Sequence, residues 1–204
     1  MARMQPLKPS DAPDLAEHFG VFEKRMGFLP NSLLTMARKP ELVKAFAALG
    51  RVVYAPTESV PLQLKNMIAN VASMAAGCQY CVAHTASNAL RPGSTIEAQK
   101  LENLWQYETS PLFSDKERAA LAFAQCAASV PNAVDDSHFA ALRRHFDDDA
   151  IVEIAAVVAY FGFLNRWNDT MATDLEPIPT KVGEEHLAEG GWKPGKHARK
   201  KAAA

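Results

Sequence analysis

The chain has few cysteines and no strong excess of charge of either sign. Only 3 of its 204 residues are cysteine, too few for a secreted domain held together by disulfide bonds, and the count is odd. The formal net charge is −1, so no overall field favours nucleic acid or an anionic membrane as a partner. These features favour a reducing cytoplasm, where a close cysteine pair is more often catalytic or metal-binding than structural.

Long apolar runs and strand patterns are also lacking. The longest apolar run, residues 154–164, has 11 residues, which is too short to span a bilayer and predicts a buried helix. The first nine residues contain no apolar stretch of the kind found in signal peptides. We therefore expect neither a membrane partner nor a secreted protein.

Helical periodicity dominates the rest of the chain. Apolar residues recur at intervals of three and four, as in Leu64, Met67, Ile68 and Val71. Residues 114–117 (Ser-Asp-Lys-Glu) fit a capping box at the start of a helix. The pattern predicts one all-α domain of about eight helices over residues 1–175.

The composition changes after Leu175. Residues 176–204 contain three prolines, four glycines and a basic end that includes Lys196, Arg199, Lys200 and Lys201. This composition predicts an irregular C-terminal extension with a solvated basic tail rather than a nucleic-acid site.

The stretch most informative about chemistry is residues 78–84 (CQYCVAH), directly after Gly77. If Gly77 ends one helix, Cys78 begins the next, where the helix dipole favours thiolate over thiol. Cys81 shares a helical face with Cys78, and the pair can form a disulfide with little backbone movement. Such a pair is typical of two-electron redox chemistry on a peroxide or a disulfide. His84, one turn after Cys81, can hold a thiolate or pass a proton to a leaving group.

Other polar residues allow further interpretations. Cys78, Cys81 and His84 are three candidate zinc ligands, but a structural zinc site needs four, and Cys126 stands alone in an apolar helix. We therefore expect no metal and no cofactor, and we interpret Cys126 as a core residue. Glu153 lies in the most apolar helix, where it either faces solvent or is a buried carboxylate able to relay protons.

A polar cluster, residues 165–168 (Asn-Arg-Trp-Asn), ends the same apolar run. It could line a pocket, contact a neighbouring subunit or serve the fold alone.

The cysteine motif from Gly77 to His84, with a helix opening near Leu62 before it, resembles the alkylhydroperoxidase D-like and carboxymuconolactone decarboxylase superfamily. Residues 26–31 (MGFLPN) followed by 39–42 (KPEL) are similar to its peroxidase-related branch, and residues 163–166 (FLNR) resemble that branch's late Asn-Arg helix. The likeness extends over roughly residues 15–175.

The resemblance implies an all-helical fold that assembles as a homo-oligomer. It also implies thiol peroxidase chemistry, with a hydroperoxide as substrate and an external dithiol as reductant. Because decarboxylase members generally lack the cysteine pair, its presence here argues against the lactone decarboxylase reaction.

Two positions depart from the family pattern. Asn66 stands where the family has a relay glutamate, and Thr85 stands where the usual histidine falls, so we expect weak peroxidase turnover. The resemblance and His84 favour Cys81 as the attacking thiol, whereas the helix-start argument favours Cys78. We expect Cys81 to attack and Cys78 to exchange with the reductant.

Two other functions fit the same sequence. A thiol–disulfide exchanger or redox sensor acting on a protein would use the same pair without a peroxide pocket. A non-catalytic helical oligomer of the same fold would use neither thiol.

Overall fold

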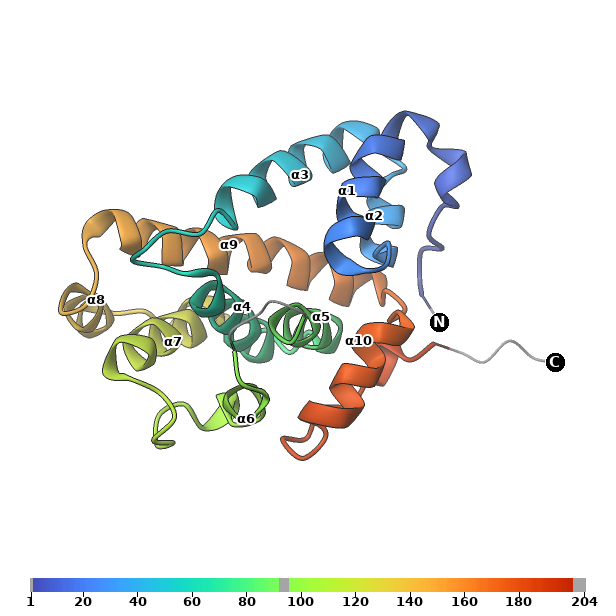
Figure 1. Ribbon diagram of the computed structural model, residues 1–204. Helices are drawn as coiled ribbons and strands as arrows, with labels where there is room; N and C mark the ends of the chain where they lie inside the picture. The colour runs from blue at the N-terminus through green and yellow to red at the C-terminus, as the bar shows by residue number, and fades with distance from the viewer. Residues whose placement is uncertain (1, 92–95, 200–204) are drawn as a thin grey trace.

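The computed structural model describes residues 2–91 and 96–199, and within these residues every regular element is a helix (Figure 1). The all-α prediction is confirmed, with ten α-helices in the described residues rather than about eight. They are α1 (Ala16–Met26), α2 (Asn31–Met36), α3 (Pro40–Val53), α4 (Leu62–Ala75), α5 (Gln79–Ala89), α6 (Ala98–Glu102), α7 (Asp115–Ala128), α8 (Asp136–Arg143), α9 (Asp148–Met171) and α10 (Pro177–Val182).

The long helix α9 organises the molecule and runs across its middle in Figure 1. Asp147 begins it as an N-cap, because its carboxylate accepts a hydrogen bond from the amide of Ala150 at 2.8 Å. Helices α3, α4, α5 and α7 pack against α9. Its residues Ile154 and Val157 are completely buried in the main core, and each such side chain stabilises the fold by about 1.5–3 kcal/mol.

Among the described residues, α9 is the one helix whose length and composition would allow it to cross a membrane. About 44% of its most apolar window is buried inside the molecule. The core helix of a soluble protein has the same properties, so this feature is weak evidence for a membrane span.

The joint between α4 and α5 follows the predicted geometry. Gly77 adopts a left-handed conformation with φ of 72°, which costs glycine little. The amide of Cys78 then donates to the carbonyl of Ser73 at 3.1 Å, and Cys78 is the extended N-cap residue of α5. The turn therefore places Cys78 at the start of α5.

Two smaller features complete the frame. Helices α1, α2 and α3 enclose a second apolar cluster that includes Leu15, Leu33 and Val43. The capping box at the start of α7 is confirmed, because Ser114 and Glu117 bond each other's amides.

The segment after Leu175 is helical where irregular structure was expected. Proline in the first turn suits α10, which packs against α5 and continues into a π-helical turn, Gly183–Leu187. Trp192 is buried and donates its indole N–H to the carbonyl of Gln79 at 3.1 Å. The division of the chain at residue 175 stays a prediction, and residues 200–204 of the basic tail lie outside the described residues.

Candidate functional site

Cys78 and Cys81 are free thiols on the first turn of α5, and both are buried. Cys78 is 0% exposed and Cys81 is 2% exposed. Each of the two thiols shifts the pKa of the other. Asn168 of α9 adds a second contact, because its Nδ2 donates to Cys81 Sγ at 3.5 Å. A polar group from another helix thus holds the second thiol of the pair.

The two thiols differ in acidity. The neighbouring Cys81 thiol is the largest influence on Cys78, and with the backbone N–H groups of Cys81 and Tyr80 it outweighs burial and lowers the pKa of Cys78. Burial is the largest influence on Cys81, and together with the neighbouring Cys78 thiol it raises the pKa of Cys81 well above the ordinary value. The first negative charge of the pair therefore forms on Cys78, and the proton stays on Cys81.

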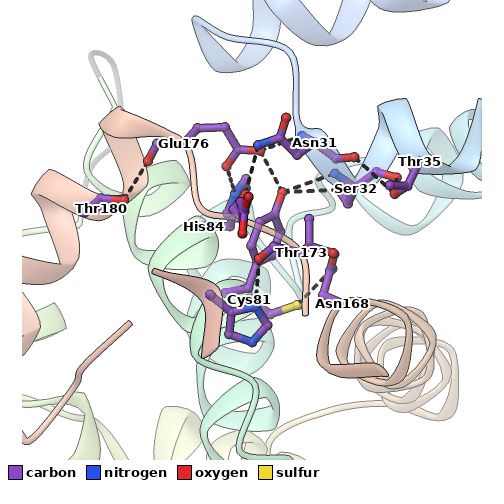
Figure 2. A network of polar contacts seen from close by, with 12 residues as sticks. Asn31, Ser32, Thr35, Cys81, His84, Asn168, Thr173, Glu176 and Thr180 are labelled. Atoms are coloured by element: carbon purple, nitrogen blue, oxygen red, sulfur yellow. Dashed lines mark hydrogen bonds and ion pairs between the residues drawn. The ribbon is translucent and has the colours of Figure 1, made fainter. Parts of the chain in front are cut away.

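A buried network lies beside the thiols and centres on Glu176, which comes just before α10 (Figure 2). Its Oε2 lies 2.6 Å from His84 Nε2. Its Oε1 accepts from the Tyr80 hydroxyl at 2.8 Å and from the Asn31 amide at 2.5 Å. In Figure 2 the Glu176 carboxylate points toward His84 and Asn31, and the Cys81 sulfur points toward Asn168. The network joins α2, α5 and the start of α10 around one carboxylate.

The carboxylate of Glu176 is held ionised. Burial by itself would raise its pKa, but the charge and hydrogen bond of His84, with the bonds from Asn31 and Tyr80, outweigh it and lower the pKa of Glu176. Burial, followed by the nearby charge of Glu176, raises the pKa of Tyr80 well above its ordinary value, so Tyr80 remains a neutral donor. His84 also stacks on the Tyr80 ring at 4.1 Å between centroids. The imidazole therefore has a fixed orientation and an anionic partner.

A cavity of about 90 Å³ opens onto Cys81, His84 and Asn168. Much of the remaining wall is aromatic, supplied by Phe22, Phe46, Tyr54, Tyr80, Tyr160 and Phe161. A larger cavity of about 400 Å³ shares Phe22, Arg25 and Tyr160 with it. Because pockets for drug-sized ligands usually measure roughly 300–1,000 Å³, the inner cavity suits a small molecule.

The structure does not bring Glu153 to the cysteines. Its Oε2 lies 2.9 Å from Lys65 Nζ and accepts from the Thr57 hydroxyl at 3.0 Å. Fifteen residues separate Glu153 from Asn168 along α9, about 22 Å at the rise of an α-helix. Glu153 therefore neutralises a buried lysine, and the carboxylate that contacts His84 is Glu176.

The two positions that depart from the family pattern are both buried. The Thr85 hydroxyl donates to the carbonyl of Cys81 at 2.8 Å and accepts from Asn70 Nδ2 at 2.8 Å. Thr85 thus ties α5 to α4 and has no ionisable group to offer. Asn66 lies on α4 and likewise cannot act as an acid or a base.

Sequence reasoning found some of these residues and missed others. Asn168 belongs to the polar cluster 165–168 and lines the cavity, as one of the three interpretations expected. Glu176 carries no spacing signal, because its partners Tyr80 and His84 are more than 90 positions away. Cys126 is half-buried rather than a full core residue.

Comparison with known proteins agrees with this fold. The profile of the carboxymuconolactone decarboxylase family matches residues 40–126. The crystal structure of the debrominase Bmp8 is 39% identical, with a TM-score of 0.82, covering 89% of this chain and 96% of that one. The structure of a cysteine-to-alanine variant of that debrominase, in complex with 2,3,4-tribromopyrrole, is 38% identical to this chain, with a TM-score of 0.83. The alkylhydroperoxidase AhpD core of an uncharacterised peroxidase-related protein from Ralstonia eutropha JMP134 is 26% identical, with a TM-score of 0.74, covering 87% of this chain and 94% of that one.

A curated relative with a shorter match is the uncharacterised protein YnjA of Escherichia coli K12. It is 38% identical over 108 residues, which are 51% of this chain and 58% of YnjA, so the match spans little more than half of that protein. The family profile, the debrominase and the AhpD core agree on one assignment: the chain belongs to the alkylhydroperoxidase D-like and carboxymuconolactone decarboxylase superfamily.

Proposed function

We propose that this protein is a dithiol oxidoreductase that reduces a small organic hydroperoxide, with Cys78 and Cys81 passing from dithiol to disulfide. One observation carries the proposal. The Cys81 sulfur lines a small cavity, and a second thiol, Cys78, whose pKa is lowered, stands three residues earlier at the start of the same helix. A lone buried cysteine has no such partner, and a packing role gives no reason for the Cys78 pKa to be lowered.

The reaction divides between the two thiols. Cys81 meets the substrate because it lines the cavity, and its proton passes to the neighbouring Cys78 thiolate as its sulfur attacks. The distal peroxide oxygen goes to Cys81 as a sulfenic acid, and the alcohol leaves with a proton. The Cys78 sulfur, deprotonated again, displaces water from the sulfenic acid and forms the disulfide. Overall, one dithiol and one hydroperoxide give one disulfide, one alcohol and one water.

His84 is the group best placed to protonate the departing alcohol. It lines the same cavity, and its ring is oriented by a hydrogen bond to an ionised carboxylate. In this proposal the His84–Glu176 pair supplies the proton transfer that neither Asn66 nor Thr85 can perform.

The burial of the thiols bears on both the substrate and the reductant. A protein disulfide cannot touch sulfurs that are 0% and 2% exposed without a local opening of the chain. Burial thus supports a small substrate over a protein target, and it favours a small dithiol as the reductant that regenerates the pair.

A second candidate substrate is a small halogenated aromatic compound. Two observations favour it. The chain is 39% identical to a debrominase but 26% identical to the AhpD core, and the wall of the cavity is largely aromatic. The balance is again two electrons: the carbon–bromine bond becomes carbon–hydrogen, bromide leaves, and the dithiol becomes the disulfide.

Turnover with a supplied small dithiol tests both substrates. We expect consumption of cumene hydroperoxide by the wild-type protein and loss of turnover to background in both Cys78→Ser and Cys81→Ser. Bromide release from a brominated pyrrole without peroxide consumption would select the second candidate. Peroxide consumption that survives in Cys81→Ser would overturn the assigned roles.

A trapping experiment separates the two thiols. After one equivalent of peroxide, a sulfenic acid should form on Cys81 in the Cys78→Ser variant, and much less should form on Cys78 in Cys81→Ser. The reverse pattern would make Cys78 the attacking thiol.

A further inference from the structure

Cys78 also lies close to two side chains that have no role in the proposed reaction. Its Sγ, a carboxylate oxygen of Asp169 and a ring nitrogen of His197 lie within 4.8 Å of one another. The three residues come from distant parts of the chain: the start of α5, the end of α9, and a short 3₁₀ turn, Gly195–His197. Three donor atoms of the kinds that bind metals therefore converge at one point, where Cys78 and His197 are buried and Asp169 is partly exposed.

His197 is the most informative of the three. Its side chain is 1% exposed, and its Nδ1 lies 2.8 Å from the carbonyl oxygen of Thr173. Because a carbonyl only accepts, Nδ1 carries the proton, and Nε2 presents a lone pair. Nε2 is buried without a hydrogen-bond partner, and Asp169 Oδ1 lies 3.7 Å from it. A buried lone pair that faces a carboxylate is well placed to bind a cation between the two.

We propose that Cys78, Asp169 and His197 form a binding site for a divalent transition-metal ion of the zinc type. Thiolate sulfur, imidazole nitrogen and carboxylate oxygen are the ligand types that zinc binds, at about 2.0–2.3 Å, and small side-chain rotations bring atoms within 4.8 Å to these distances. Three protein ligands leave a fourth position for water.

The surroundings fit such a site. The bond from His197 Nδ1 to a backbone carbonyl fixes the ring orientation, as it does in many metal-binding histidines. Lys196 holds Asp169 Oδ2 at 2.7 Å and leaves Oδ1 for the ion. Asp169 is 40% exposed and lines an open groove of about 820 Å³ along α7 and α9, which gives the ion a route in.

Metal binding and disulfide formation exclude each other in this arrangement. The ion holds Cys78 as a thiolate and releases one proton to solvent, so the sulfur cannot also bond to Cys81. The proposed site is therefore not the set of candidate zinc ligands considered from the sequence, which was Cys78, Cys81 and His84. The two sets share only Cys78.

The test is a titration of the reduced full-length protein with Co²⁺, followed by displacement with Zn²⁺. We expect one ion per chain and a thiolate-to-cobalt charge-transfer band. His197→Gln and Asp169→Asn should each weaken binding at least about tenfold. Cys81→Ser and His84→Gln should retain it, as should the matched control His186→Gln, whose ring pairs with Glu102 at the surface. Prior oxidation to the Cys78–Cys81 disulfide should abolish the band.

Two results would overturn the site. In the first, the wild-type protein binds Co²⁺ no more tightly than His197→Gln and Asp169→Asn do. The other is loss of binding in Cys81→Ser or His84→Gln as large as in His197→Gln, which would assign the ion to the sequential motif. Because the titration uses no peroxide, its outcome is independent of the proposed turnover.

Discussion

At the scale of single residues, the chemistry depends on the unequal acidity of two neighbouring thiols. The Cys81 thiol and the amides at the start of α5 lower the pKa of Cys78, whereas burial raises the pKa of Cys81. This direction agrees with the prediction from the helix start, and the cavity favours Cys81 as the attacking sulfur. Cys78 therefore has the lowered pKa, and Cys81 has the access to substrate.

The first prediction concerns pH. Because the pKa of Cys78 is lowered, the reactive mono-anion of the pair forms below the ordinary cysteine value of 9.0. The rate of disulfide formation in a single turnover should rise with pH and level off, with a midpoint below 9.0. Stopped-flow measurement of the rate from acid to alkaline pH checks this, and a midpoint above the ordinary value contradicts it.

The second prediction concerns Glu176. Replacing it by Gln removes the charge that His84, Tyr80 and Asn31 share, and should lower the free energy of unfolding at neutral pH by about 1–3 kcal/mol. Its folded pKa lies below the ordinary 4.5, so its contribution is complete above that pH and is lost as pH falls through the folded value.

The difference between wild type and Glu176→Gln should accordingly shrink below about pH 4.5. Urea unfolding at several pH values measures it, with the exposed Glu184→Gln as the matched control. A difference that stays constant down to low pH would show that the carboxylate's charge has no part in the network.

At the scale of elements, the joint between α4 and α5 was predictable because its signals are local. Gly77 predicts the end of one helix, and the cysteine spacing directly after it predicts the start of the next. Glu176 and His197 were not predictable in the same way, because each acts across more than 90 positions of sequence, on His84 and Cys78 respectively. Their segment has many prolines and glycines, which predicted irregular structure, yet packing of α10 and Trp192 against α5 orders it.

The third prediction tests that joint. Gly77→Ala places a Cβ at φ of 72° with no atom within 4 Å, so the cost is backbone strain alone, about 1–2 kcal/mol. Gly20→Ala in the exposed face of α1 also meets no atom within 4 Å, and should stabilise the fold by about 0.5–1 kcal/mol. Thermal or urea unfolding of both variants gives the answer; equal effects of the same sign would mean that the left-handed turn is unimportant.

At the scale of the whole molecule, the fold was readable from the sequence and the subunit number was not. Helical periodicity needs only neighbours in sequence, whereas association depends on surfaces that no local pattern fixes. The homo-oligomer expected from the family resemblance therefore stays a prediction. Light scattering on purified protein should give a multiple of the chain mass of 22.3 kDa, and a mass equal to one chain would contradict it.

The proposed reaction is also a property of the whole molecule, because α2, α5, α9 and the start of α10 all contribute to the cavity or to the network beside it. The most direct test is a single turnover of the fully reduced protein with one equivalent of cumene hydroperoxide. It is read by thiol counting and by mass mapping of the peptide that carries residues 78–84. We predict the loss of two thiols, a disulfide between Cys78 and Cys81, and one alcohol per chain. If both thiols survive in a folded protein while the peroxide remains intact, the peroxidase account is contradicted.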